Sequence, residues 1–241
     1  GVPKLMSRWA YRKAVLAALA AIFLSILMVT TWCQVRYWAN SITLFRRALE
    51  VTSNNHVAHS NLGIALFFQG KRDEAIVHFH KALKINPSFV DAHINLGIVL
   101  ANKGKTAAAV SQFSKALQIN PNSDEAHNNL GLALERQGKT AEAIKHYYEA
   151  LRINPDSDEA HSNLGFAMAS QGQLDKAMSH YSEALRINPR FAKVHNNLGI
   201  ALIRKENLEV AIVHFRKALR IKPDYAKAHE NLERALEILK K

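Results

Sequence analysis

Residues 93–121, HINLGIVLANKGKTAAAVSQFSKALQINP, decide the fold, because this stretch recurs every 34 residues along most of the chain. The tripeptide Asn-Leu-Gly begins at residues 61, 95, 129, 163 and 197, and a degraded copy, Asn-Leu-Glu, begins at residue 231. Prolines keep the same step, at residues 87, 121, 155, 189 and 223. A fixed period of this length predicts a solenoid, in which small repeated units bury their apolar faces on one another.

Within one period the spacing of the apolar residues predicts two antiparallel helices. The packed face of the first helix is expected to contain His93, Leu96, Gly97 and Leu100, and that of the second Ala109, Phe113 and Ala116. Gly97 and Ala116 are small, so two helix backbones can approach each other, and Phe113 fills the space that remains.

The ends of these helices are also predicted by the sequence. Gly104 stands where the first helix must end and supplies a left-handed turn residue. Asn120 precedes Pro121, which pushes it out of the helical region and ends the second helix. Asp91 lies where the first helix begins, and an acidic side chain there suits the helix dipole.

This pattern resembles the tetratricopeptide repeat. In the first copy the family's small and large positions fall on Leu62, Gly63, Ala75, Phe79, Ala82 and Pro87. The resemblance implies an all-α fold, a right-handed superhelix of helix pairs. It departs from the family at position 4, commonly aromatic, which is histidine in every copy. In the fifth copy Glu206 replaces the turn glycine, so a less regular turn is expected there.

The repeats define a division of the chain. We expect five repeats over 56–89, 90–123, 124–157, 158–191 and 192–223, followed by a capping helix over 224–241. Residues 34–55 are interpreted as a junction and a half-repeat cap, because Phe45 and Ala48 stand one period before Phe79 and Ala82. A polar terminal cap is what an open-ended stack requires.

Residues 14–33 are interpreted as a transmembrane helix, since twenty residues without a charge are long enough to cross the hydrocarbon layer. Aromatic residues flank this run on both sides, and residues 1–13 form a basic juxtamembrane segment. A cleaved signal peptide is the rival interpretation, but its apolar region is shorter and ends in small residues. The positive-inside bias places the repeats on the non-cytoplasmic side of the membrane.

The net charge of +12 is unevenly distributed. Residues 186–222 contain nine basic and two acidic residues, whereas acids outnumber bases by eight to four in residues 122–159. One interpretation is solvated outer helix faces, and another is a basic end that attracts an acidic partner or an anionic membrane surface. Nucleic-acid binding is not favoured, because only the net charge supports it. The single cysteine, Cys33, allows no intramolecular disulfide.

No catalytic constellation is recognisable by spacing, so neither an enzyme activity nor a cofactor is predicted for this chain. The twelve histidines raise the question of a metal site. One column at position 4 contains His59, His93, His127, His161, His195 and His229, and a second at position 23 contains His78, His146, His180 and His214. Helix axes about 8–10 Å apart are too far for successive members of a column to share a zinc ion. The first column is interpreted as packing, and the second as either solvated or touching position 4.

The candidate binding residues follow from the family resemblance, in which positions 2, 5, 6, 9, 12 and 13 of the first helix face a concave groove. Position 6 is Asn61, Asn95, Asn129, Asn163 and Asn197, and position 9 is Ile64, Ile98, Leu132, Phe166 and Ile200. An amide both donates and accepts, as a peptide backbone requires. The column looks like the asparagine ladder of O-linked N-acetylglucosamine transferases, which holds extended polypeptide. The alternative is that Asn-Leu-Gly is simply common in consensus-like repeats.

Three functions are therefore kept open. The first is a membrane-anchored scaffold that binds an extended polypeptide in its groove. The second follows from the junction around Trp38 and residues 44–49, which looks like the C-terminal part of transmembrane-and-tetratricopeptide-repeat glycosyltransferases. In that case the chain is a fragment, whose repeats present an acceptor protein to a catalytic part upstream. The third is an assembly subunit of a membrane complex, for which self-association is left open.

Overall fold

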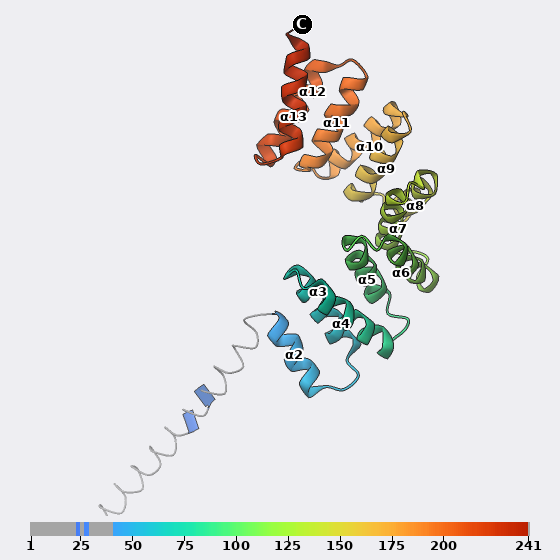
Figure 1. Cartoon of the computed structure of the whole chain (residues 1–241), viewed down its shortest axis with the longest axis vertical. Coiled ribbons are helices and arrows are strands. Elements are labelled where there is room, and N and C mark those ends of the chain that lie inside the picture. The colour runs from blue at the N-terminus through green and yellow to red at the C-terminus, as the bar shows by residue number, and fades with distance from the viewer. Residues whose placement is uncertain (1–22, 25–26, 29–40, 241) are drawn as a thin grey trace, which may run out of the picture. The chain divides into compact units, whose positions relative to one another are not determined.

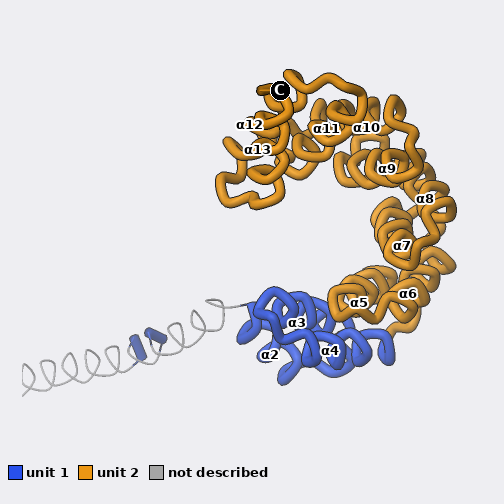
Figure 2. Tube along the Cα trace, turned by 45° about the horizontal axis from the view of Figure 1, so that its top comes forward, with its two compact units in different colours: residues 1–85 blue, residues 86–241 orange. Residues whose placement is uncertain are grey.

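The computed structural model describes residues 23–24, 27–28 and 41–240, and every structural statement below concerns these residues. Over them the chain forms twelve helices, α2 to α13, and no strand, which confirms the predicted all-α solenoid (Figure 1). The chain divides into two compact units, residues 1–85 and residues 86–241 (Figure 2).

The first unit contains α2 (Ser41–Val51), α3 (His56–Phe68) and α4 (Arg72–Ile85). Helix α3 packs against both α2 and α4. Its start is fixed by Asn55, whose side-chain oxygen accepts a hydrogen bond from the backbone N–H of Ala58 at 2.8 Å. Ile42 is the buried residue of α2, and Phe79 of α4 is buried against Gly63.

The second unit is a row of helix pairs. Its helices are α5 (Val90–Asn102), α6 (Thr106–Ile119), α7 (Asp124–Arg136), α8 (Thr140–Ile153), α9 (Asp158–Ser170), α10 (Leu174–Ile187), α11 (Ala192–Arg204), α12 (Leu208–Ile221) and α13 (Ala226–Leu239). Each of α5, α7, α9 and α11 packs against the helix that follows it and against the next odd-numbered helix. The odd-numbered helices form the inner row of the curve and the even-numbered ones the outer row (Figure 2).

The core of each pair is an aromatic ring packed on a glycine, as the sequence predicts. Leu96 and Ala116 are fully buried, and Phe113 is 1% exposed. A Cβ added at Gly97 would stand only 2.5 Å from Cε1 of Phe113, so no larger residue fits without a shift. The same contact recurs between Gly131 and Tyr147. The period of the sequence therefore corresponds to a packing contact, between a glycine and an aromatic ring, that recurs in every helix pair.

The turns inside the pairs need a residue with positive φ, and Gly104 provides it with φ +74°. At the fifth turn Glu206 adopts φ +60°, so the prediction of a less regular turn there is wrong. The backbone N–H of Glu206 donates to the Ile203 carbonyl, and that of Asn207 donates to the Leu202 carbonyl, each at 2.9 Å. These two bonds hold the glutamate in the left-handed conformation that glycine adopts elsewhere.

The transmembrane helix predicted over residues 14–33 is not supported. Among the described residues no helix is both long and apolar enough to cross a membrane. The helices α2 to α13 have 11–14 residues, whereas a span needs about 20. This finding contradicts the predicted localisation, a single-span membrane protein with its repeats on the non-cytoplasmic side. Apart from residues 23–24 and 27–28, the segments 1–13 and 14–33 lie outside the described residues.

Candidate peptide-binding groove

The inner row of the second unit carries a hollow of about 530 Å³. It is lined by Leu132 and Glu135 of α7, Asn163 and Phe166 of α9, Lys193, Asn196, Asn197 and Ile200 of α11, and Tyr225, Lys227, Glu230, Asn231 and Arg234 in and before α13. Four consecutive inner helices thus contribute to one surface. We call this surface the groove.

The groove brings together five of the residues predicted from the sequence: Leu132, Asn163, Phe166, Asn197 and Ile200. The predicted residues Asn95, Ile98 and Asn129 lie on α5 and α7 of the same unit but do not line it. Asn61 and Ile64 lie on α3 of the first unit. The candidate site is therefore concentrated on α7, α9, α11 and α13.

Two asparagine side chains of the groove are each hydrogen-bonded to an asparagine of the preceding repeat. Asn163 Nδ2 donates to Asn128 Oδ1 at 3.0 Å, and Asn231 Nδ2 donates to Asn196 Oδ1 at 2.9 Å. In each pair the acceptor stands 35 residues before the donor. An amide that donates one N–H still offers a second N–H and its carbonyl oxygen. These bonds therefore orient the amides of Asn163 and Asn231, and each amide keeps an N–H and a carbonyl oxygen with which it can bind a ligand.

Asn197 differs from its equivalents in other repeats. Among the described residues its Nδ2 is buried and has no hydrogen-bond partner, and its Oδ1 lies 3.5 Å from Asn196 Nδ2. A buried donor without an acceptor costs about 1–3 kcal/mol. Asn197 also lines a smaller hollow of about 150 Å³ beside Phe166. Asn197 therefore has an unused hydrogen-bond donor, and its side chain lines both the groove and the smaller hollow.

The apolar part of the groove centres on Phe166. Its side chain is 48% exposed, although the equivalent Leu132 and Ile200 are half-buried. A large apolar side chain exposed inside a hollow is more informative than one on a convex surface, because it can be covered by a ligand. Phe166 therefore offers a contact for an apolar side chain of a bound segment.

Charged groups of both signs line the groove. Lys193, Lys227 and Arg234 line the same hollow as Glu135 and Glu230. Tyr147 Oη donates to Glu135 Oε2 at 3.1 Å, and burial raises the pKa of the Glu135 carboxyl.

The sequence-based choice of site residues missed these charged groups. Lys193 and Lys227 occupy position 2 of their repeats, Glu230 position 5, Arg234 position 9 and Glu135 position 12. All are positions that the family resemblance assigns to the groove, so the signal that would have found them was present.

The two histidine columns contact each other in four of the helix pairs. The Nδ1 atoms of His59 and His78, His127 and His146, His161 and His180, and His195 and His214 lie 3.0–3.1 Å apart. In the second repeat Gln112 replaces the partner and lies 2.8 Å from His93 Nδ1. Among the described residues no group of three or more histidine, cysteine or acidic side chains stands close enough to hold a metal ion. The second column therefore touches the first instead of being solvated.

These pairs should make the protein less stable as the pH falls. Burial, with the neighbouring His195 and Lys217, lowers the pKa of His214 to about 4, and burial also lowers the pKa of His146 and His180. The unfolded chain takes up these protons near pH 6.5, before the folded chain does, so stability is lost from there downward. We expect urea unfolding to show a loss of about 1–3 kcal/mol between pH 7.5 and pH 5, allowing for solvent at half-buried rings.

The natural pair of His93 and Gln112 supplies the control for this prediction. The variant His146→Gln/His180→Gln/His214→Gln should lose clearly less stability over the same pH interval. An unchanged pH dependence in this variant would show that groups other than the histidine pairs cause it.

Comparison with known proteins identifies the repeats. The family described as "TPR repeat" matches residues 99–138, 136–172 and 167–206. Families described as "Tetratricopeptide repeat" match residues 56–89, 78–111 and 192–225. Together these matches extend over residues 56–225.

Solved structures agree with this assignment. YrrB, described as a TPR protein with an unusual peptide-binding site, is 26% identical with a TM-score of 0.58, over 77% of this chain and 96% of YrrB. MamA is 28% identical with a TM-score of 0.59, over 69% of this chain and 97% of MamA. PilF of Pseudomonas aeruginosa is 23% identical with a TM-score of 0.70, over 77% and 84% of the two chains, and shares the fold.

No curated protein matches the chain in the corresponding search of sequences. None of the comparisons supports the resemblance to transmembrane glycosyltransferases that the junction suggested. They support a scaffold for protein–protein interaction, which is the general use of this fold.

Proposed function

Residues 56–225 of this chain are tetratricopeptide repeats, and from this we propose that the second unit binds an extended segment of a partner protein in its groove. One observation carries the proposal. Asparagine side chains on three consecutive inner helices, at 163, 197 and 231, line the same hollow as the exposed Phe166.

The row of asparagines suits an extended peptide, because both present hydrogen-bonding groups at regular intervals. An extended chain offers a backbone N–H and a carbonyl at every residue, and its side chains alternate between two faces. Amides held in orientation by their neighbours can bond to the backbone whatever the sequence is. Phe166, with Leu132 and Ile200 on either side of it, receives apolar side chains of the partner. This contact gives the groove a preference for segments that contain such side chains.

The similarity to YrrB, a TPR protein with an unusual peptide-binding site, supports this proposal. The mixed charges in the groove, with Lys193 and Lys227 against Glu135 and Glu230, favour a partner segment that is itself mixed in charge. In this proposal the chain recognises protein and transforms no substrate.

The proposed architecture follows the division expected from the sequence. Residues 56–223 act as five repeats, and residues 34–55 and 224–241 cap the two ends. In α13 the side chains of Glu230, Glu233, Arg234 and Glu237 are exposed, which supports a polar cap.

Removing three amides of the column should weaken peptide binding. In the variant Asn163→Ala/Asn197→Ala/Asn231→Ala, whose three asparagines line the groove, we expect the dissociation constant for unstructured peptides to rise about tenfold or more, because each lost hydrogen bond costs about 0.5–1.5 kcal/mol. The measurement is fluorescence anisotropy of a pool of labelled unstructured peptides with the full chain.

The control variant changes three exposed residues of the outer helices, Gln118→Ala/Lys145→Ala/Ser179→Ala, and should bind as the unmodified chain does. Circular dichroism verifies that both variants are folded. Unaltered binding by the folded asparagine variant would remove the ladder from the proposal.

A further inference from the structure

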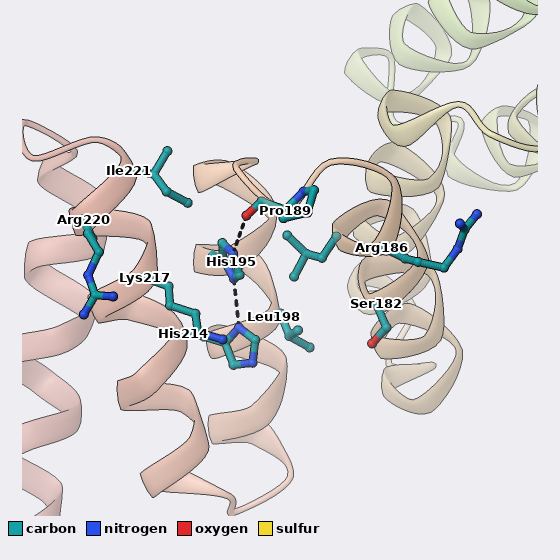
Figure 3. Close-up of a pocket in the computed structure, with 10 residues that line it drawn as sticks. Ser182, Arg186, Pro189, His195, Leu198, His214, Lys217, Arg220 and Ile221 are labelled. Atoms are coloured by element: carbon teal, nitrogen blue, oxygen red, sulfur yellow. Dashed lines mark hydrogen bonds between the residues drawn. The ribbon is translucent and has the colours of Figure 1, made fainter.

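Another hollow, of about 540 Å³, lies in the last repeats between α10 and the pair formed by α11 and α12 (Figure 3). It is separate from the groove and shares no lining residue with it. Among its lining residues are Ser182, Lys217 and Arg220, together with the pair His195 and His214. The lining contains no acidic residue. We call this hollow the basic pocket.

The basic pocket differs at two positions from the equivalent place one period earlier. One period earlier, Tyr148 stands in the place of Ser182 and packs its ring edge-on to His180, with ring centres 6.3 Å apart. Glu183 likewise stands in the place of Lys217, where it forms an ion pair with Arg186 at 2.7 Å. Relative to that earlier repeat, the basic pocket has the small hydroxyl side chain of Ser182 in place of the tyrosine ring. It has the cationic side chain of Lys217 in place of the glutamate.

Two cationic side chains of the basic pocket, Lys217 and Arg220, are not neutralised by acidic partners among the described residues. Among the described residues neither Lys217 nor Arg220 forms an ion pair, whereas the guanidinium of Arg186 is held by Glu183 and Asp156. Figure 3 shows the Lys217 side chain running towards His214, and Arg186 pointing away from it. An unpaired ammonium that lines the same concave, partly apolar site as a hydroxyl attracts an anion.

The histidine pair fixes where its protons lie. The Pro189 carbonyl can only accept, and it lies 3.1 Å from His195 Nε2, so this nitrogen carries a proton. The Nδ1 of neutral His195 therefore accepts, and Nδ1 of His214 donates to it at 3.0 Å. His214 Nε2 is then left with a lone pair. It can accept a hydrogen bond from a ligand that carries a proton.

We propose that the basic pocket binds a small organic molecule that carries a phosphoryl group. The phosphoryl oxygens accept hydrogen bonds from Lys217 and Ser182, and one proton is shared between the phosphoryl group and His214 Nε2. The organic part lies against Leu198 and Ile221, which also line the hollow. The volume suits such a ligand, since small-molecule sites measure about 300–1,000 Å³, far more than phosphate alone needs.

The test is titration of the full chain with phenyl phosphate, phenyl sulfate and inorganic phosphate at pH 7, followed by NMR of isotope-labelled histidine rings. The His214 signal is assigned by its loss in His214→Gln. We expect a saturable shift of this signal with phenyl phosphate, and weaker binding of inorganic phosphate, which lacks the apolar part. Phenyl sulfate brings no proton for His214 and should bind about tenfold more weakly or worse.

Two variants make the test decisive. Lys217→Glu changes an exposed side chain, so it should fold normally, yet it should abolish the shift of His214. Tyr148→Ser/Glu183→Lys should install a second site one repeat earlier, seen as a new saturable shift of His180. Equal binding of phosphate and sulfate esters, or binding unchanged by Lys217→Glu, would overturn the proposal.

Discussion

Tyr147→Ala should lower the free energy of unfolding by about 3–5 kcal/mol, the usual cost of removing a large buried aromatic side chain. The Tyr147 ring is fully buried and packs on Gly131, where an added Cβ would meet its Cε1 at 2.6 Å. The substitution also removes the hydroxyl that donates a hydrogen bond to the half-buried carboxylate of Glu135. Urea unfolding followed by circular dichroism measures the change.

The neighbouring residue supplies a matched control. Tyr148 is 46% exposed, so Tyr148→Ala should cost about 1 kcal/mol or less. Tyr147→Phe keeps the ring and removes the hydroxyl, and should cost about 1 kcal/mol. Equal losses for Tyr147→Ala and Tyr148→Ala would mean that the aromatic position does not form the core of the helix pair.

Gly97→Ala should be destabilising by about 1–3 kcal/mol, because it overpacks the core. This sign is opposite to the usual one, since alanine in a helix interior normally stabilises by about 0.5–1 kcal/mol relative to glycine. The new Cβ would lie 2.5 Å from Cε1 and 2.8 Å from Cζ of Phe113, whose ring is buried and has little room to move.

A double variant separates this contact from a general effect on the helix. Phe113→Leu shortens the ring side chain, so Gly97→Ala should cost less in the Phe113→Leu background than in the unmodified chain. The coupling between the two substitutions, from a double-mutant cycle in urea, is expected to be favourable by about 0.5–3 kcal/mol. Additive effects, or stabilisation by Gly97→Ala alone, would show that the helices are not in close contact at this glycine.

The period of the sequence was sufficient to predict the helix pairs, their small and aromatic contacts and most of their turns. These features depend on which residue types recur at one spacing, and the spacing is visible without a structure. The turn at Glu206 was mispredicted, because two backbone hydrogen bonds stabilise its positive φ against the preference of the side chain. The apolar run at residues 14–33 led to a membrane location that the described helices do not support.

The site was only partly predictable, for reasons of geometry. The bonds from Asn163 to Asn128 and from Asn231 to Asn196 depend on how far one inner helix is displaced along the next, which a single repeat does not reveal. The contact between the histidine columns depends on the rotation of two helices about their axes. The basic pocket combines Ser182 with Lys217, where the preceding repeat has Tyr148 and Glu183, so it is a difference between repeats that a search for their similarity overlooks.

The most direct test of the central claim is photo-crosslinking of a bound peptide from inside the groove. A benzophenone amino acid replaces Phe166 in one variant and Tyr148, on the outer helix α8, in the other; the two side chains are 48% and 46% exposed. With labelled unstructured peptides, the account predicts a covalent adduct from position 166 and none from position 148. Equal adducts from both positions, or an adduct from position 148 alone, would contradict it.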